Sequence, residues 1–304
     1  MKGAAFDIQA IGNLRKIKQA EYKPVEHDPA KDFYVVCTDL AKDGQADTAV
    51  IVARVSIGDY RFTYRFVNLF TIDSSDYEVV ANILKQTVTK YDARMLIYDA
   101  NGIGASLREW LNKPTIAKDG LRYEGLGIIN PPDANQVIHY RDSRLNICYE
   151  IKSGGSKASE IHRNFFGKMS NGSIRLLVKS ADALSHFKDI KNFALANNRK
   201  KDAYMRPYQY TDLLETELKN LDIKDTSDAV NSYIVIVQRN KNIQKDFFSA
   251  AEYLVYAVGQ HIEMPYYIEK KKKENKRQIT AFISGKGGQR SNTHAIEARR
   301  RKRR

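Results

Sequence analysis

Three apolar runs of strand length follow one another between residues 32 and 70, and they restrict the fold more than any other feature. They read DFYVVCTDL, TAVIVARVSI and RFTYRFVNLF, rich in β-branched and aromatic residues. Only AKDGQAD and GDY separate them, and both segments are typical of turns. Connections this short predict that the three strands form an antiparallel meander.

Helices and strands then alternate. SDYEVVANILKQTVTKYD has helical spacing of its apolar residues, ARMLIYDA is a fourth strand, GASLREWL is a helix and EGLGIIN is a fifth strand. Three antiparallel strands followed by crossovers predict an α/β fold, a mixed five-stranded sheet flanked by helices, with an added C-terminal hairpin and helix region.

The rest of the chain is expected to be mainly helical. Helices are predicted in RDSRLNICYEIK, KASEIHRNFFGKM, ADALSHFKDIKNFALAN, YTDLLETELKNL and KDFFSAAEYLVYAVGQH, and a strand in SYIVIVQRN. Residues 1–31 are polar and mixed, which predicts an N-terminal arm or linker. We assign the folded domain to residues 32–268 and a basic, disordered tail to residues 269–304.

Composition excludes several classes of protein. No apolar run approaches the roughly 20 residues that a membrane span needs. The two cysteines stand in apolar runs and the six histidines have no zinc-site spacing, so neither a disulfide framework nor a zinc site is expected. We expect a soluble intracellular protein without a membrane partner.

The positive charge is concentrated in the tail. The chain has a net charge of +14, and residues 270–304 hold 14 Lys and Arg against two acids, which is +12. Such a tail could bind DNA phosphates or an acidic partner, or simply be a solvated terminus.

Acidic residues stand where strands end. Asp39 ends the first strand run and Asp99 ends the fourth. If these two strands are parallel neighbours, both carboxylates emerge at one end of the sheet. Asp246 begins the last helix and can complete the cluster, although Asp225 and Asp228 compete for this third place. Each acid could instead be only a turn or cap residue.

Carboxylates that converge in this way favour a hard cation. Close acids repel one another unless a cation sits between them, and Mg²⁺ or Mn²⁺ prefers such oxygen ligands. Two ions of this kind can activate a water and stabilise the leaving oxygen of a phosphodiester.

The chain resembles the nuclease domain of the large terminase subunit of tailed bacteriophages, a ribonuclease H-like fold. The resemblance lies in CTDLAKDGQADTAVIVARV, in the Asp-Ala-x-Gly-x-Gly motif of LIYDANGIGASLREWL, and in LLETELKNL followed by VQRNKNIQKDFFSAAEYLVYA. It implies that Asp39, Asp99 and Asp246 are catalytic and bind two metal ions. In the family a basic residue commonly follows the third aspartate, whereas this chain has Phe247.

The resemblance also implies a role and partners. The role is a metal-dependent endonuclease that cuts concatemeric viral double-stranded DNA during genome packaging, in the cytoplasm of an infected bacterial host. The implied partners are the terminase ATPase part, the small terminase subunit and the portal. SGGSKAS and SGKGGQR lack the spacing of an ATPase phosphate loop, so this chain is not expected to pump DNA by itself.

Other readings stay open at this point. Lys152, Lys157 and Arg163 could touch DNA phosphates beside the metals, or form a solvated helix start. A junction resolvase or a transposase-like nuclease of the same fold would need the same acids. A DNA-docking or portal-docking module without catalysis would hold the acids only for structural reasons.

Overall fold

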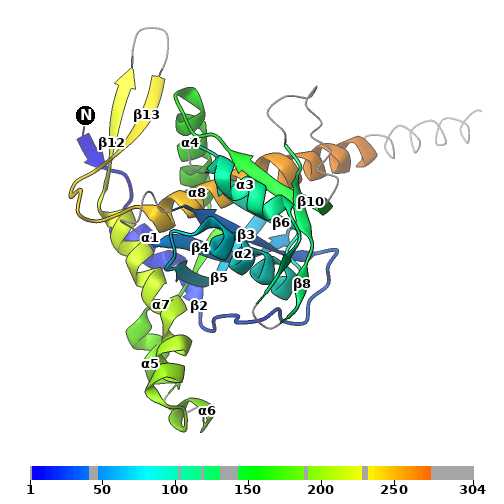
Figure 1. The fold of residues 1–304 in the computed structure, drawn as a ribbon. Coiled ribbons are helices and arrows are strands. Elements are labelled where there is room, and N and C mark those ends of the chain that lie inside the picture. Colours follow the sequence, from blue (N-terminus) through cyan, green and yellow to red (C-terminus); the bar gives the residue numbers. More distant parts are fainter. Residues whose placement is uncertain are drawn as a thin grey trace, which may run out of the picture. The chain divides into compact units, whose positions relative to one another are not determined.

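A mixed eight-stranded sheet forms the centre of the first part of the chain (Figure 1). The computed structural model describes residues 2–40, 47–101, 104–117, 120–130, 143–187, 191–227 and 232–274. In spatial order, the strands are β2 (Arg15–Ile17), β11 (Ile174–Leu177), β5 (Phe62–Ile72), β4 (Thr48–Ile57), β3 (Asp32–Asp39), β6 (Met95–Asp99), β10 (Ser143–Ile151) and β9 (Gly125–Ile128).

Five central strands confirm the predicted fold class. β3, β4 and β5 form the antiparallel meander, β6 lies parallel beside β3, and β10 lies parallel beside β6. A meander whose first strand is also the parallel neighbour of a later strand is the core of a ribonuclease H-like sheet. The strands β2, β11 and β9 extend this core at its two edges.

The helix predicted for RDSRLNICYEIK is wrong, because residues Ser143–Ile151 of this segment form β10. The strand lies between β6 and β9, and its residues Cys148, Glu150 and Ile151 are all buried. Burial along β10 does not follow hydrophobicity, because the charged Glu150 is buried whereas Leu145 is 55% exposed. A short run of this kind fits a helix as well as a strand. EGLGIIN does contain a strand, β9, but this strand pairs with β10 at the edge of the sheet and not with β6.

Helices cover both faces of the sheet. On one face α2 (Tyr77–Tyr91) and α3 (Gly104–Asn112) pack on β3, β4 and β6, with Leu84 and Leu107 in the same buried cluster as Val36 and Leu96. Asp76 starts α2 by accepting the backbone N–H of Glu78 at 2.8 Å. On the other face α8 (Asp246–Val258) reaches β3, where the Cys37 thiol lies against the backbone of Leu254.

Residues before β3 contribute to this structure. β1 (Lys2–Ala4) pairs with β12 (Leu221–Ser227), which forms a hairpin with β13 (Ser232–Gln238). α1 (Ile8–Leu14) follows, and it buries Ile11 and Leu14. The hairpin and α8 are the C-terminal addition that we predicted to the five-stranded core.

The remaining elements are shorter or peripheral. They are α4 (Ser156–Ser170), α5 (Ser180–Phe187), α6 (Lys191–Ala194), α7 (Asn198–Lys219) and the two-stranded pair β7 (Thr115–Ile116) with β8 (Arg122–Tyr123). The helix predicted over residues 181–197 is present as α5 and α6, and α7 begins well before the predicted residue 210.

The chain divides into two compact units, Met1–Ala257 and Val258–Arg304. In the second, the π-helical turn η1 (Gly259–Glu263) continues as helix to residue 274, and residues 275–304 lie outside the described part. No described helix is both long enough and apolar enough to cross a membrane.

Candidate active site

Asp39 and Asp99 leave the sheet at the same end. β3 and β6 are parallel neighbours, and Thr38 lies opposite Tyr98, so the next residue of each strand is one of the two aspartates. Burial, and then the charges of Asp246 and Asp99, raise the pKa of Asp39 to about 7. The structure therefore brings both Asp99 and Asp246 within electrostatic reach of Asp39.

Asp246 is contributed by a segment distant in the sequence, as the first residue of α8. Burial raises its pKa, and the ammonium of the preceding Lys245 opposes this effect. Lys245 also lowers the pKa of Asp39, although burial and the neighbouring acids outweigh it. Lys245 therefore supplies positive charge at the edge of the acidic cluster.

A fourth acid, Glu217 of α7, belongs to this cluster and was missed in the sequence. Its carboxylate accepts the backbone N–H of Phe248 at 2.7 Å and that of Phe247 at 3.4 Å, so it caps the start of α8. Burial, opposed by these bonds and reinforced by Asp246 and Asp39, raises its pKa to about 8. Its place inside LLETELKNL, among leucines on a helix, was the available signal.

The turn after Asp99 is built by close backbone contact. A Cβ on Gly104 would lie 2.2 Å from the carbonyl oxygen of Asp99, so only glycine lets α3 start this close to the strand end. The carboxylate of Asp99 accepts the backbone N–H of Asn101 at 2.8 Å. Asp99 is thus the turn residue that one reading expected, and a member of the acidic cluster as well.

A partly buried ion pair links α3 to the strands beneath it. Arg108 donates two bonds of 2.5 and 2.6 Å to the carboxylate of Glu150, a residue of β10 that also accepts a bond from Tyr98 at 2.7 Å. Bidentate pairs of this kind hold both orientation and distance. The Arg108–Glu150 pair therefore helps to position α3, and with it the turn that follows Asp99.

Hydroxyl groups surround the cluster. The Ser249 side chain hydrogen-bonds the carboxylate of Asp39. The hydroxyls of Tyr253 and Ser153 lie 2.9 Å apart, and Asn101 donates to the Ser153 side chain at 3.1 Å. These bonds connect α8 to the loops that follow β6 and β10, so that three segments distant in the sequence meet at the cluster.

A cavity of about 520 Å³ adjoins the cluster on the side of α7. Asp246, Glu217 and Asp47 line it together with apolar and amide side chains of α7 and the loop before α8. Two members of the cluster, Asp246 and Glu217, therefore border a hollow, whereas Asp39 and Asp99 are not among its lining residues.

The donor set fits a hard divalent cation. Burial is the main reason why the pKa values of Asp39, Asp246 and Glu217 are raised, and neighbouring acids add to it at Asp39 and Glu217. Among the residues that the structure describes, no three His, Cys, Asp or Glu side chains already form a ligand set for a metal ion. The fit rests on oxygen donors gathered in a partly buried setting, not on finished coordination.

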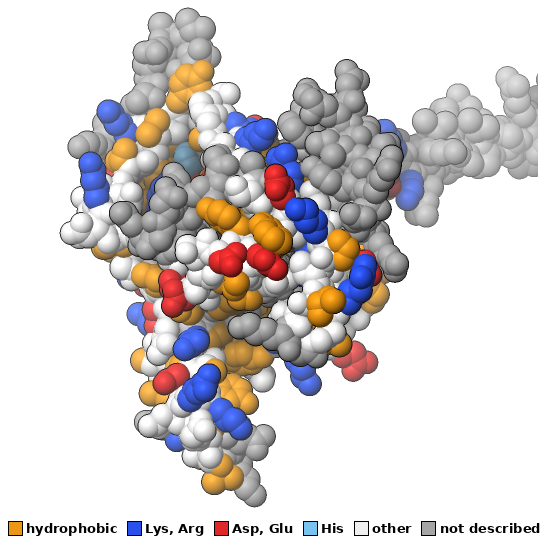
Figure 2. Space-filling model, in the orientation of Figure 1, with side chains coloured by type: hydrophobic (Ala, Val, Ile, Leu, Met, Phe, Trp, Pro, Cys, Tyr) orange, Lys and Arg blue, Asp and Glu red, His pale blue; other side chains and the backbone are white. Residues whose placement is uncertain are grey.

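The other candidates lie beside or outside the cluster. Lys152 is exposed next to Ser153, and Arg163 is exposed on α4. Lys157 bonds Tyr256 and, at 3.2 Å, Glu160, so its ammonium is engaged within the protein. Asp228 lies outside the described residues, and Asp225 is described only as a residue of β12. On the face shown in Figure 2, Lys and Arg are dispersed among acidic and hydrophobic side chains.

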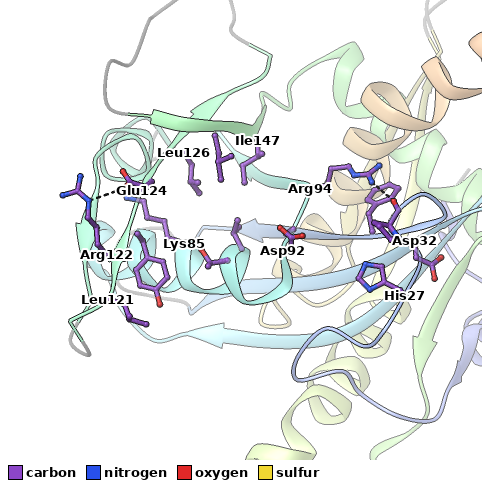
Figure 3. A pocket seen from close by; sticks show the side chains of 17 residues that line it. His27, Asp32, Lys85, Asp92, Arg94, Leu121, Arg122, Glu124, Leu126 and Ile147 are labelled. Carbon is purple, nitrogen blue, oxygen red and sulfur yellow. Dashed lines mark hydrogen bonds and ion pairs between the residues drawn. The ribbon is translucent and has the colours of Figure 1, made fainter.

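A cavity of about 680 Å³ lies away from these acids, near the first residues of β3 and β6 (Figure 3). Asp32 and Arg94 line it, whereas Asp39 and Asp99 stand at the opposite ends of the same two strands. Its charged groups have partners: Arg122 pairs with Glu124 at 3.2 Å, and Lys85 donates to the carbonyl of Trp110 at 2.8 Å. We do not assign this cavity to the acidic cluster.

Comparison with known proteins gives a distant likeness in structure. No family model and no curated protein matches the sequence. The chain resembles terminase nuclease domains. The large terminase nuclease of the thermophilic phage G20c is 12% identical, with a TM-score of 0.44 over 84% of this chain and 98% of that one. The nuclease domain of the large terminase subunit of bacterial virus Sf6 is 10% identical, with a TM-score of 0.45 over 84% and 97%.

A third similar structure is the large terminase of bacteriophage HK97, at 10% identity and a TM-score of 0.45. The likeness covers 84% of this chain but only 44% of the HK97 protein. The G20c nuclease was also determined with bound magnesium, and a K428A mutant of the Sf6 domain with manganese. The bound metals are properties of those proteins.

Proposed function

We propose that this chain is a divalent-metal-dependent DNA endonuclease that cuts concatemeric viral double-stranded DNA during genome packaging. One observation carries the proposal. A half-buried carboxylate, Asp39, lies within electrostatic reach of Asp99 and Asp246 at the end of two adjacent parallel strands in a ribonuclease H-like sheet. The sequence motifs around these three aspartates support the same reading.

Asp39, Asp99 and Asp246 would hold the metal, with Mg²⁺ or Mn²⁺ as the fitting ions and two as the proposed number. Bound there, the ions would supply an activated water and charge stabilisation for phosphodiester hydrolysis. Asp39 is the central ligand in this proposal, since both other acids act on it and Ser249 orients it. Asp99 is held by its turn and Asp246 by the start of α8.

Other side chains position these ligands. Glu217 caps α8 and so fixes where Asp246 begins the helix. Lys245 would attract the phosphate backbone toward the acids, because its charge acts on Asp39 and Asp246. Lys152, at the edge of the cluster, would add a contact to the DNA backbone, whereas Lys157 and Arg163 remain weaker candidates.

The role implies further properties. Contacts to phosphates carry no sequence information, so we propose slight sequence preference. The partners would be double-stranded DNA, the terminase ATPase part, the small terminase subunit and the portal, and the site of action would be the cytoplasm of an infected bacterium.

Plasmid cleavage tests the proposal. Supercoiled plasmid is incubated with the protein and Mg²⁺, Mn²⁺ or EDTA, and nicked and linear products are counted. We expect cutting with Mn²⁺ or Mg²⁺, none with EDTA, and a loss of at least about 100-fold in Asp39→Asn and Asp99→Asn, since a lost ligand removes much of the stabilisation of the transition state.

Asp92→Asn is the matched control, because Asp92 is an exposed residue at the other end of the sheet and its left-handed backbone (φ 48°) suits asparagine. Wild-type rates in Asp39→Asn would reject the proposal. Faster cutting of branched DNA than of linear duplex would favour a junction resolvase instead.

A further inference from the structure

Three arginines stand in one row across neighbouring strands of the large sheet. Arg54 of β4 lies directly opposite Arg65 of β5, and Arg65 lies directly opposite Arg175 of β11. Residues that oppose one another in paired strands project from the same face, with adjacent strands about 4.8 Å apart. The register therefore fixes three guanidinium groups side by side.

The row opens into a cavity of about 400 Å³. Lys16 adds a fourth basic side chain to its wall, and Glu21 is the one acid among the lining residues. Glu21 is already engaged, since it pairs with Arg54 at 2.9 Å and accepts a bond from Tyr34 at 2.5 Å. The cavity thus has a clear excess of positive charge.

The arginines have fewer partners than they can use. Among the described residues Arg65 bonds only the Ser56 side chain. Arg54 pairs with Asp32 at 3.6 Å as well as with Glu21, but its Nε is buried without a hydrogen-bond acceptor in the described part of the chain. No hydrogen bond or ion pair of the Arg175 side chain occurs in the described part of the chain. Burial, and then the charges of Arg54 and Arg175, lower the pKa of Arg65.

Like charges placed directly opposite each other destabilise a sheet, so this arrangement costs free energy when the cavity holds no anion. An anion with several oxygens would relieve the repulsion and accept the unused N–H groups. Guanidinium groups match phosphate in particular, because their paired donors bind two of its oxygens at once. We propose that the Arg54–Arg65–Arg175 row is a binding site for a phosphate group.

This phosphate site is separate from the acidic cluster. Arg54 pairs with Tyr34 near the start of β3, whereas Asp39 is the last residue of that strand. The site is therefore independent of the proposed metal chemistry. The phosphate could belong to the DNA backbone or to a small phosphate compound, and the experiment separates these two sources.

The first test is thermal unfolding of the full chain in EDTA, with inorganic phosphate compared with chloride at equal ionic strength. Phosphate at roughly ten times its Kd is expected to raise the Tm of the wild type by about 3 °C or more above chloride. Arg65→Gln with Arg175→Gln should lose this rise. In chloride its Tm should equal or exceed that of the wild type, since repulsion is removed. Arg199→Gln with Lys200→Gln, two exposed residues of α7, loses the same charge and should keep the rise.

The second test is fluorescence anisotropy of a 20-base-pair duplex in EDTA at several salt concentrations. If the row binds DNA, the Arg65 and Arg175 variant should bind more weakly and its salt slope should fall by about 1–2 relative to the Arg199 and Lys200 variant. Unchanged DNA binding together with a lost phosphate response would identify a small phosphate compound as the ligand.

The wild type alone can overturn the proposal. If phosphate stabilises it no more than chloride, the row is not a phosphate site. This comparison needs no variant, so a double variant that fails to fold leaves the test intact.

Discussion

At the scale of single residues, the acidic cluster depends on side chains that do no chemistry themselves. Glu217 is 2% exposed, and its carboxylate accepts hydrogen bonds from the first backbone N–H groups of α8. Those groups have no partner within the helix and lie in a buried setting, so an acceptor from another element is needed. The position of Asp246 therefore depends on a residue of α7.

Replacing Glu217 tests this dependence. Gln keeps an acceptor for the N–H of Phe248, and Leu removes it, so Glu217→Leu should be less stable than Glu217→Gln by about 1–3 kcal/mol. Urea unfolding measures the difference, and plasmid cutting should fall further in the Leu variant. Equal stability of the two variants would contradict the capping role.

Lys85 is a second buried charge, 1% exposed, and burial lowers its pKa to about 8. Its pKa in the unfolded chain is the ordinary 10.5, so the native state binds this proton less readily. Below pH 8 the Lys85 amine is charged in both the native and the unfolded state, and burying this charge lowers the free energy of unfolding by the full amount. The cost disappears as the pH rises from 8 to 10.5.

We therefore expect the wild type to gain stability relative to Lys85→Met as the pH rises from 8 to 10. The gain should be about 1–2 kcal/mol, because solvent in the adjoining cavity screens part of the shift. Urea unfolding of both proteins at each pH cancels the contributions of the tyrosines. A constant difference across this range would show that Lys85 titrates normally.

At the scale of elements, the join between β6 and α3 is the tightest part of the site. Gly104 permits a contact that no other residue allows, and the Arg108–Glu150 pair then holds α3 over β10. The end of β6, the turn before Gly104 and the start of α3 thus form one unit that fixes the position of Asp99.

Gly104→Ala should destabilise the protein by more than about 1 kcal/mol and reduce cutting, because the added methyl group meets the Asp99 carbonyl. Gly12→Ala is the matched control. Gly12 lies within α1 with nothing within 4 Å of an added Cβ, so alanine there should stabilise the protein by about 0.5–1 kcal/mol. Equal effects at the two glycines would show that the close approach does not exist.

At the scale of the whole molecule, most of the net positive charge lies in a different part of the sequence from the proposed metal ligands. Residues 270–304 carry +12 of the net +14, while every proposed metal ligand lies before them. The tail has no apolar periodicity, so it offers little to a core.

Deletion of residues 270–304 should leave the Tm nearly unchanged and preserve metal-dependent cutting at saturating DNA. If the tail binds DNA, the deletion should weaken binding most at low salt and flatten the salt slope by about 0.9 for each phosphate that the tail neutralises. Anisotropy of a labelled duplex across salt concentrations measures both effects. An unchanged affinity and slope would leave a protein partner, or no role, for the tail.

The sequence by itself determined the meander, the fourth strand, the start of α8 and the candidates Asp39, Asp99 and Asp246. These features follow from local periodicity and short connections, which act within a few residues. β10 escaped prediction because its buried residues include the charged Glu150 while Leu145 is exposed, so local hydrophobicity did not mark it as a strand. Glu217 and the Arg54–Arg65–Arg175 row were decided only by tertiary structure. A cap from another helix and the register between strands depend on which distant segments pair, and no local pattern records that choice.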